Sequence, residues 1–410
     1  MAGESLTAAD AGQGVWARTP AAARVAVVYL AARVVTTVFL IVAGALAGFD
    51  SRFGPQASLE DLILGWDARW YWIVAETGYP TDLPLTDSGA VAENQWAFMP
   101  LYAYAAKLVA VPFGGQWTTG ALIVSLVAGY AASFVLYRMM RERMDSGAAM
   151  WAVAFFAAGP LAALFQLGYA EPLALLWLFL ALWCVMRRRY AWLYALIPLM
   201  AFTRPGVLAF ALFLGLFGVW RWFQRRREPL LTREIVHIVA LGALAVITGF
   251  AWQLIAGWAT GEDGAYLATE LAWRRNWVAG EAVFLPLEGF LSGTAFWFGS
   301  MWGLTAELGY VVLGALVVIV AAVLLFEPRV RRLGVEIRLW SASYLVYLLL
   351  VFFPQSSIFR LLLPLSPLWG AFAIPRSTVW RVGILCAGLL GQWWWIYNMY
   401  ALGNTIWQVP

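Results

Sequence analysis

The sequence predicts an all-α, polytopic membrane protein with about 11 transmembrane helices, within a range of about 9–13. Three observations predict this class. Hydrophobic residues make up 63% of the 410 residues and charged residues 12%, against about 45–50% and about 25% in soluble domains. Apolar runs recur along the chain. The arginines between them form short clusters, which indicates membrane orientation rather than a nucleic-acid interface.

The first apolar run, residues 22–46, is expected to be a retained signal anchor, because it is too long for a signal-peptide core and further spans follow it. Several later runs are shorter than the ~20 residues that a spanning helix needs, so their helices must extend into the neighbouring motifs. Two stretches, 96–113 and 283–305, either span the membrane or lie in the membrane–water interface. The expected spans are 22–46, 117–137, 148–167, 171–186, 191–204, 206–222, 235–258, 309–326, 339–353, 360–374 and 380–400.

The arginine distribution sets the expected orientation. If 96–113 does not span, 19 of the 27 basic residues fall on one side, and the positive-inside rule makes that side cytoplasmic. The C-terminus is then extracytoplasmic. We therefore expect residues 1–410 to form a single integral membrane domain with two long extracytoplasmic loops, 47–116 and 259–308. Four polar interruptions also point outward: the Asp67 segment, 168–172, 203–206 and 354–360.

Scarce residues exclude several chemistries. The two cysteines, Cys184 and Cys386, lie in separate apolar runs and indicate no disulfide framework or metal motif. His237 is the single histidine, which argues against a Ser-His-Asp triad and a His-rich metal site. No phosphate-binding glycine motif is present. The sequence requires no cofactor, although the acidic outer loops leave a divalent metal open. The residue types that remain as candidates for a functional site are carboxylates, arginines and the 25 tryptophans.

The most informative segment is residues 65–80. Gly78 and Pro80 are stop signals, so a helix over about 67–77 is predicted. This segment is too short and too charged to span, and its aromatic residues suit an interfacial helix. Asp67, at or near the N-cap, is either a general base at the membrane surface or merely a cap. At helical spacing one face carries Asp67, Trp70, Tyr71 and Val74.

Residues 66–80, WDARWYWIVAETGYP, resemble the WDAxWYxxIAxxGY motif of the PIG-V family. That family includes the endoplasmic-reticulum enzyme that adds the second mannose to GPI anchors, together with many bacterial homologues. Weaker matches follow in the expected order at residues 96–102, 168–172, 202–206 and 356–360. The resemblance covers about residues 20 to 375 and identifies the chain as similar to membrane glycosyltransferases of superfamily C.

The resemblance implies an inverting mannosyltransferase with a superfamily C fold and interfacial helices in its first outer loop. The implied donor is polyprenyl-phosphate mannose, the acceptor is a lipid or a glycan, and Asp67 is the implied catalytic carboxylate. A bacterial, actinobacterial homologue would lie in the plasma membrane with an extracytoplasmic active site. Its partners would be these substrates and membrane lipids, with no nucleic acid.

The remaining candidates have two interpretations each. Arg204 and Arg360 either hold the donor phosphate through their guanidinium forks or have a structural role, as Arg204 would by pairing with Glu171. Glu171 either caps a helix or acts as a second carboxylate, and Tyr169 belongs to the expected donor site. Arg69 either joins that site or is an exposed residue that contacts solvent or lipid headgroups. Arg33, inside the first span, is expected to pair within the bundle. The expected substrate contacts are Trp66, Trp70, Tyr71, Trp96, Ser356 and Ser357.

Three alternatives remain at this point. Charges of the second outer loop, namely Glu262, Asp263, Arg274 and Arg275, either bind the acceptor or are only solvated. The chain as a whole could instead be a lipid or sugar transporter or flippase, although no internal repeat is evident and the polar interruptions lie on one side. It could also be a non-catalytic subunit of a glycosyltransferase complex, against which the retained Asp67 argues.

Overall fold

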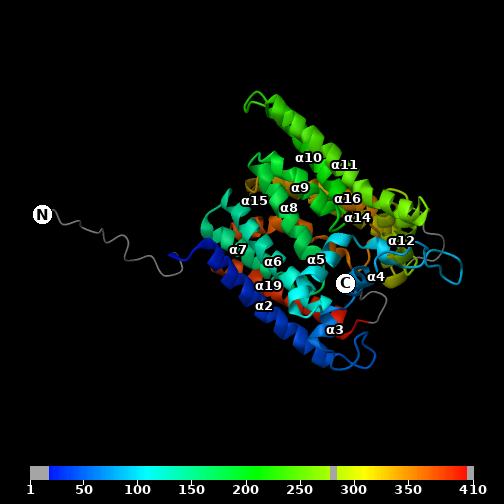
Figure 1. The fold of residues 1–410 in the computed structure, drawn as a ribbon. Helices are drawn as coiled ribbons and strands as arrows, with labels where there is room; N and C mark the ends of the chain where they lie inside the picture. The colour runs from blue at the N-terminus through cyan, green and yellow to red at the C-terminus, as the bar shows by residue number, and fades with distance from the viewer. Residues whose placement is uncertain (1–17, 278–283, 404–410) are drawn as a thin grey trace.

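The computed structural model describes residues 18–277 and 284–403, which fold into a helical bundle (Figure 1). Within those ranges the only β pairing is an isolated bridge between Leu85 and Val91. The α-helices are α2 (Ala21–Leu46), α3 (Leu59–Ile63), α4 (Asp67–Thr77), α5 (Pro100–Ala110), α6 (Trp117–Arg141), α7 (Ser146–Ala157), α8 (Glu171–Met186), α9 (Leu193–Ala201), α10 (Val207–Gln224), α11 (Thr232–Thr260), α12 (Ala265–Arg274), α13 (Glu288–Ala295), α14 (Ala306–Phe326), α15 (Pro328–Arg332), α16 (Val335–Val351), α17 (Ile358–Leu361), α18 (Trp369–Ala373) and α19 (Thr378–Ile396). Short 3₁₀ and π segments connect them: η1 (Gln95–Ala97), η2 (Val111–Phe113), η3 (Ala162–Gln166), η4 (Tyr190–Trp192), η5 (Phe296–Met301), η6 (Leu363–Leu368) and η7 (Tyr397–Ala401).

The all-α membrane class predicted from composition is confirmed. Five of the described helices are long and apolar enough to cross a membrane, namely α2, α6, α10, α11 and α14. Shorter apolar helices, including α7 and α8, lie between them. The count of about 11 spans stays a prediction, since several expected spans form short or divided helices. The run 360–374, for example, consists of α17, η6 and α18.

The two ambiguous stretches form short helices. In 96–113 the helix α5 has 11 residues, which is about 17 Å of helix and too short to cross a bilayer alone. In the described part of 283–305, the helix α13 has eight residues. Neither stretch is therefore one continuous spanning helix.

Helix α6 lies at the centre of the bundle and packs closely on its neighbours through small residues. A Cβ atom added at Gly120 would lie 2.0 Å from the carbonyl oxygen of Ala106 in α5. One added at Gly129 would lie 2.4 Å from the hydroxyl of Tyr29 in α2. Small residues allow such close backbone approach, which is how helices associate where no hydrophobic effect drives them together.

Arg33 lies in the middle of α2 and is 4% exposed. Its guanidinium donates to the carbonyl oxygens of Ala157 and Ala162, at the end of α7 and the start of η3. The rings of Tyr29 and Phe165 flank it at 5.1 and 5.3 Å. The expected pairing inside the bundle is thus made with backbone carbonyl groups rather than with a carboxylate, and that of Ala157 is one that α7 leaves unbonded at its end.

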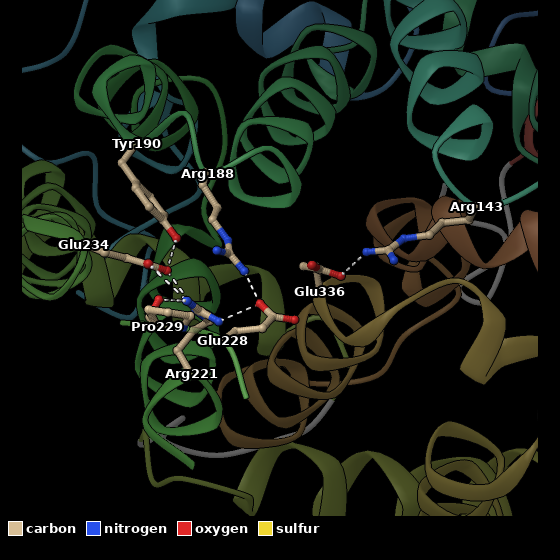
Figure 2. Close-up of polar contacts among 8 residues, drawn as sticks. All are labelled: Arg143, Arg188, Tyr190, Arg221, Glu228, Pro229, Glu234 and Glu336. Carbon is tan, nitrogen blue, oxygen red and sulfur yellow. Dashed lines mark hydrogen bonds and ion pairs between the residues drawn. The ribbon is translucent and has the colours of Figure 1, made fainter. Parts of the chain in front are cut away.

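A polar network joins the ends of α10 and α11 (Figure 2). Arg221, in the last turn of α10, has a fully buried side chain and donates to Glu234 and Glu228 at 2.9 Å. Tyr190 donates to Glu234, and Arg188 pairs with Glu228. Every charged head in this network has a partner, as a buried arginine requires. The network therefore fixes the arginine-rich end of the bundle.

The arginine clusters and the polar motifs lie at opposite ends of the same helices. Arg204 lies just before the start of α10 and Arg221 in its last turn, and the helical rise from Val207 to Arg221 is about 21 Å. Helix α8 begins at Glu171 and is followed by the cluster 187–189. The motifs that are expected to point outward therefore lie at the end of the bundle away from the arginine clusters.

Candidate active site

Helix α4 begins at Asp67 and ends at Thr77, so the helix predicted over about 67–77 is confirmed. Tyr71 and Val74 lie on its buried face. Trp66 precedes the helix in a left-handed conformation, with φ of 56° and ψ of −123°. Such a conformation is unfavourable for a large residue and persists only where the surroundings hold it.

Three contacts of the indole hold Trp66 in this conformation. Its indole N–H donates to the carbonyl oxygen of Met399 in η7 at 3.0 Å. The guanidinium of Arg52 lies 4.4 Å from the centre of its ring, and the ring of Phe53 meets it edge-on. We refer to these contacts of Arg52, Phe53 and Met399 on Trp66 as the indole clamp. It joins the start of α4 to the C-terminal segment and so fixes where Asp67 begins its helix.

The carboxylate of Asp67 accepts a hydrogen bond from the guanidinium of Arg360, and this contact is also an ion pair. Arg204 pairs with Glu171, and Arg360 lies 3.7 Å from the same carboxylate. The four side chains are 5–20% exposed, and they come from α4, α8, α17 and the turn before α10. Four residues expected at the site from sequence are therefore brought together as an alternating row of charges, which we name the charged cluster.

The cluster is neutral as a whole. Ionised groups so far from water are stable only when paired, and the alternation gives each arginine a carboxylate. The Arg204–Glu171 pairing that the sequence left as a structural alternative is present. The capping alternative for Asp67 is weaker, since its carboxylate binds Arg360 and lies one residue inside the helix. The row is still compatible with an anionic ligand, which can replace a carboxylate on either arginine.

Tyr169 and the turn around it pack against the charged cluster. Tyr169 is fully buried, with Arg360 5.6 Å from the centre of its ring. The hydroxyl of Ser125 in α6 donates to the carbonyl of Leu167 at 2.8 Å. A Cβ atom at Gly168 would lie 2.7 Å from the Cβ of Ala68 in α4. Only glycine therefore lets the turn before Glu171 approach Asp67 this closely.

Aromatic rings cover α4. Trp70 stacks on Phe98 with ring centres 5.8 Å apart and meets Trp273 of α12 edge-on at 5.6 Å. Tyr71 is 3% exposed and packs edge-on against Phe98. Trp96 is also 3% exposed, and its indole N–H donates to the carbonyl of Pro80. Trp70, which is only partly buried, is thus better placed than Trp96 to offer a ring to a ligand.

Three further expected residues lie around the cluster rather than in it. Ser356 and Ser357, just before α17, are 8% and 2% exposed. Arg69 is exposed on the other side of α4 and forms none of the ion pairs of the cluster. Its role in donor binding stays a prediction, as do the substrate contacts of both serines.

One acidic residue of this region was missed by sequence reasoning. Glu270 lies on α12, in the expected second outer loop (259–308), and its pKa is raised to about 7 chiefly by burial and further by the charge of Asp67. A hydrogen bond from Tyr266 and the charge of Arg204 act in the opposite direction. The spacing of Tyr266, Glu270 and Trp273, which places all three on one helical face, was the available signal.

Two arginines of the same loop have structural contacts. Arg274 pairs with Glu288 and donates to Ser292 at 2.8 Å, and Arg275 donates to the carbonyl of Val91. Both tie α12 to its surroundings. Within residues 18–277 and 284–403, no group of three or more His, Cys, Asp or Glu side chains is arranged to hold a metal ion.

Fold and site define an all-helical integral membrane protein with a buried, charged cluster at one end. No protein-family model and no curated protein matches the sequence. Among solved structures, two of an oligosaccharyltransferase from Archaeoglobus fulgidus are similar, one in complex with Zn and sulfate and one with an inhibitory peptide and a dolichol-phosphate. Both have 14% identity and a TM-score of 0.43, and the matches cover 88% and 89% of this chain.

The chain spans about half the length of these structures, since the matches cover 53% and 55% of them. A third structure of the same protein, tethered to an acceptor peptide, has 12% identity and a TM-score of 0.36. These scores are too low to assign a shared topology. Function is therefore argued from the residues of this chain.

Proposed function

We propose that this chain is an inverting membrane glycosyltransferase of superfamily C. It moves mannose from a polyprenyl-phosphate donor to a lipid-linked or glycan acceptor at the extracytoplasmic face of a bacterial plasma membrane. The observation that carries this proposal is the charged cluster, in which two carboxylates alternate with two arginines beside an aromatic wall. The motif resemblance of residues 66–80 supports mannose as the sugar.

The arginines suit the phosphate of such a donor. A polyprenyl phosphosugar carries one negative charge, and its phosphate gains a second as the bond to the sugar breaks. A guanidinium fork matches phosphate oxygens in pairs, and donors fixed in place stabilise charge that develops in the transition state. Arg360 and Arg204 are paired with carboxylates in the cluster, so the phosphate would bind by taking over these contacts.

Asp67 is then the residue that accepts the proton. When the phosphate binds Arg360, the carboxylate of Asp67 loses its partner and becomes available to the acceptor hydroxyl. The acceptor oxygen bonds to the anomeric carbon as the bond from that carbon to the phosphate oxygen breaks. The electron pair leaves with the phosphate, and the acceptor proton moves to Asp67. Direct displacement inverts the anomeric centre.

A lipid-linked donor agrees with the surface next to Arg204. An apolar groove runs between α10 and α11, which lie side by side in Figure 1, and it is lined by residues such as Leu208, Leu212 and Val246. Leu208 follows Arg204 by four residues, so the groove begins close to the charged cluster. An isoprenoid chain lying along it would place its phosphate near the arginines.

Transfer by the purified protein tests the proposal. The protein, reconstituted in nanodiscs, is incubated with radiolabelled polyprenyl-phosphate mannose and lipid extracted from bacterial membranes. We expect a labelled product that requires both the donor and the extract, with polyprenyl phosphate released in equal amount. In a parallel reconstitution in liposomes, a transporter would move the donor across the bilayer without releasing polyprenyl phosphate, and a non-catalytic subunit would show neither activity. Either of those results excludes the proposed function.

A further inference from the structure

A stripe of three residues on α12 faces the charged cluster. Tyr266, Glu270 and Trp273 occur at positions i, i+4 and i+7, which share one face of a helix. The neighbouring Thr269 is fully buried and accepts a hydrogen bond from Asn94 at 2.8 Å, which pins α12 to η1. We name Tyr266, Glu270 and Trp273 the α12 stripe.

The stripe meets α4 through an aromatic contact. Trp273 packs edge-on against Trp70 at 5.6 Å. Asp67 lies one turn before Trp70 on α4, and Glu270 lies one turn before Trp273 on α12. Glu270 lies within electrostatic range of both Asp67 and Arg204, which places its carboxylate in the same region as the charged cluster.

Glu270 differs from the other two carboxylates in its partners. Asp67 and Glu171 are each paired with an arginine, whereas within the described ranges Glu270 forms no ion pair. The groups that face it are the hydroxyl of Tyr266 on its own helix, Tyr347 on α16, Arg204, and Asp67 on α4. Its carboxylate therefore has oxygen lone pairs that no arginine occupies and that a ligand can use.

We propose that the α12 stripe is the acceptor-binding wall of the site and that the acceptor it recognises is a polyol, such as a sugar or cyclitol head group. This inference rests on the proposed function and goes beyond it by naming the chemical class of the acceptor. A carboxylate accepts hydrogen bonds from neighbouring hydroxyls of a polyol. Aromatic rings beside it, here Trp273 and Trp70, cover the apolar faces of such a ring.

The stripe also predicts how acceptor binding depends on pH. Burial raises the pKa of Glu270 to about 7, so the carboxylate is ionised above that pH and protonated below it. The ionised form accepts hydroxyl hydrogen bonds more strongly. The concentration of acceptor needed for half-saturation should therefore fall as the pH rises from about 6 to about 8, about one unit to either side of this pKa.

The experiment compares wild type with Glu270→Gln, using donor at saturation and a dilution series of the bacterial lipid extract. Glu307→Gln is the control, because Glu307 is exposed in the same loop. We expect Glu270→Gln to raise the half-saturating extract concentration at least about tenfold, as loss of a charged hydrogen bond does. Its pH dependence should disappear, while the maximal rate and the donor KM stay within about threefold of wild type.

Other outcomes overturn the inference in distinct ways. An unchanged half-saturation in Glu270→Gln, or a lower maximal rate with unchanged half-saturation, excludes acceptor binding by Glu270. A wild-type product in which mannose is linked to a peptide or a simple aliphatic alcohol excludes the polyol class. Absence of any transfer by wild type contradicts the proposed function instead. If Glu270→Gln gives little folded protein, Tyr266→Phe removes one hydroxyl of the stripe and should raise half-saturation by a smaller factor.

Discussion

At the scale of single residues, the charged cluster depends on arginine rather than on any positively charged side chain, because only a guanidinium offers paired N–H donors. Arg360 contacts both Asp67 and Glu171, whereas Arg204 contacts Glu171. A lysine at either position would keep the positive charge but lose the paired geometry that suits phosphate oxygens. The cluster should therefore remain neutral in a lysine variant while phosphate recognition suffers.

We expect Arg360→Lys and Arg204→Lys to raise the donor KM at least about tenfold, while the yield of folded protein stays near wild type. Donor titrations at saturating acceptor measure this, and Arg226→Lys, exposed beyond α10, is the control. Alanine variants should also lose stability, by about 3–5 kcal/mol if the carboxylates are left buried and unpaired. Equal destabilisation by lysine and alanine, with donor KM unchanged in the folded fraction, would show that the arginines are structural.

At the scale of elements, the start of α4 depends on contacts from distant segments. The left-handed conformation of Trp66 is held by the indole clamp, which includes the carbonyl of Met399 from the C-terminal segment. Gly168 allows the turn before Glu171 to approach α4. The start of α4 is thus held by the C-terminal segment through Trp66 and by the turn at Gly168. These contacts favour a constant position of Asp67 relative to Arg360.

The clamp is tested by Trp66→Gly. Glycine adopts a positive φ without strain, so the backbone should keep its conformation, but loss of the packed indole should lower the thermal stability, and kcat is therefore measured per folded molecule. Without the indole the position of Asp67 is no longer fixed, and small misplacements at a reacting centre lower the rate by up to about 10²-fold. We expect kcat to fall at least about tenfold with both KM values within about threefold of wild type.

Trp66→Phe separates the hydrogen bond from the packing, because it keeps an aromatic ring and loses the indole N–H. We expect its kcat to lie between those of wild type and Trp66→Gly. Trp258→Phe, at a residue that is 87% exposed, is the matched control. A wild-type kcat in Trp66→Gly would mean that the clamp does not position Asp67.

Local signals in the sequence were sufficient for α4 but not for its partners. Gly78 and the polar start at Asp67 predicted its limits, because stop signals act within a few residues. The pairing of Asp67 with Arg360 joins residues 293 positions apart, so it depends on the packing of the whole bundle. The same holds for the contact between Trp66 and Met399.

Glu270 was missed for a related reason. It lies in a charged loop, where acidic residues are usually solvated, and no motif of the resemblance includes it. Its burial arises because α12 folds back on α4 through Trp273 and Trp70, a contact between two loops that are far apart in sequence. Arg33 shows the opposite case: an arginine inside an apolar run predicted internal pairing, and the bundle supplies it.

At the scale of the whole molecule, the two ends of the bundle differ in chemistry. One end carries the network of Arg221, Glu228 and Glu234 (Figure 2), and the other carries the charged cluster. The positive-inside rule predicts that the first end is cytoplasmic. The proposed reaction therefore belongs to the extracytoplasmic side, where a lipid-linked sugar supplies the donor.

Cysteine labelling in intact cells tests this orientation. In a variant with Cys184 and Cys386 replaced by serine, we introduce Ser88→Cys in the first outer loop or Arg226→Cys beyond α10, both at exposed positions. A membrane-impermeant maleimide should label Ser88→Cys directly and Arg226→Cys only after permeabilisation. The reverse pattern would place the charged cluster in the cytoplasm and contradict the extracytoplasmic reaction.

The central claim is that Asp67 accepts the proton of the acceptor hydroxyl, and Asp67→Asn tests it most directly. Asparagine keeps the shape of the side chain and can still accept a hydrogen bond from Arg360, and Glu171 remains 3.7 Å from that arginine, so Asp67→Asn should fold and lose less stability than Asp67→Ala. An amide cannot take up the proton, and general-base catalysis contributes about 10²–10⁴-fold.

The measurement is the turnover of mannosyl transfer per folded molecule in wild type, Asp67→Asn and Asp67→Ala. The account predicts that both variants lose at least about 10²-fold in turnover per folded molecule, with Asp67→Asn less destabilised than Asp67→Ala. A stable Asp67→Asn protein whose turnover lies within about threefold of wild type would contradict the account, because no general-base role is compatible with so small a loss.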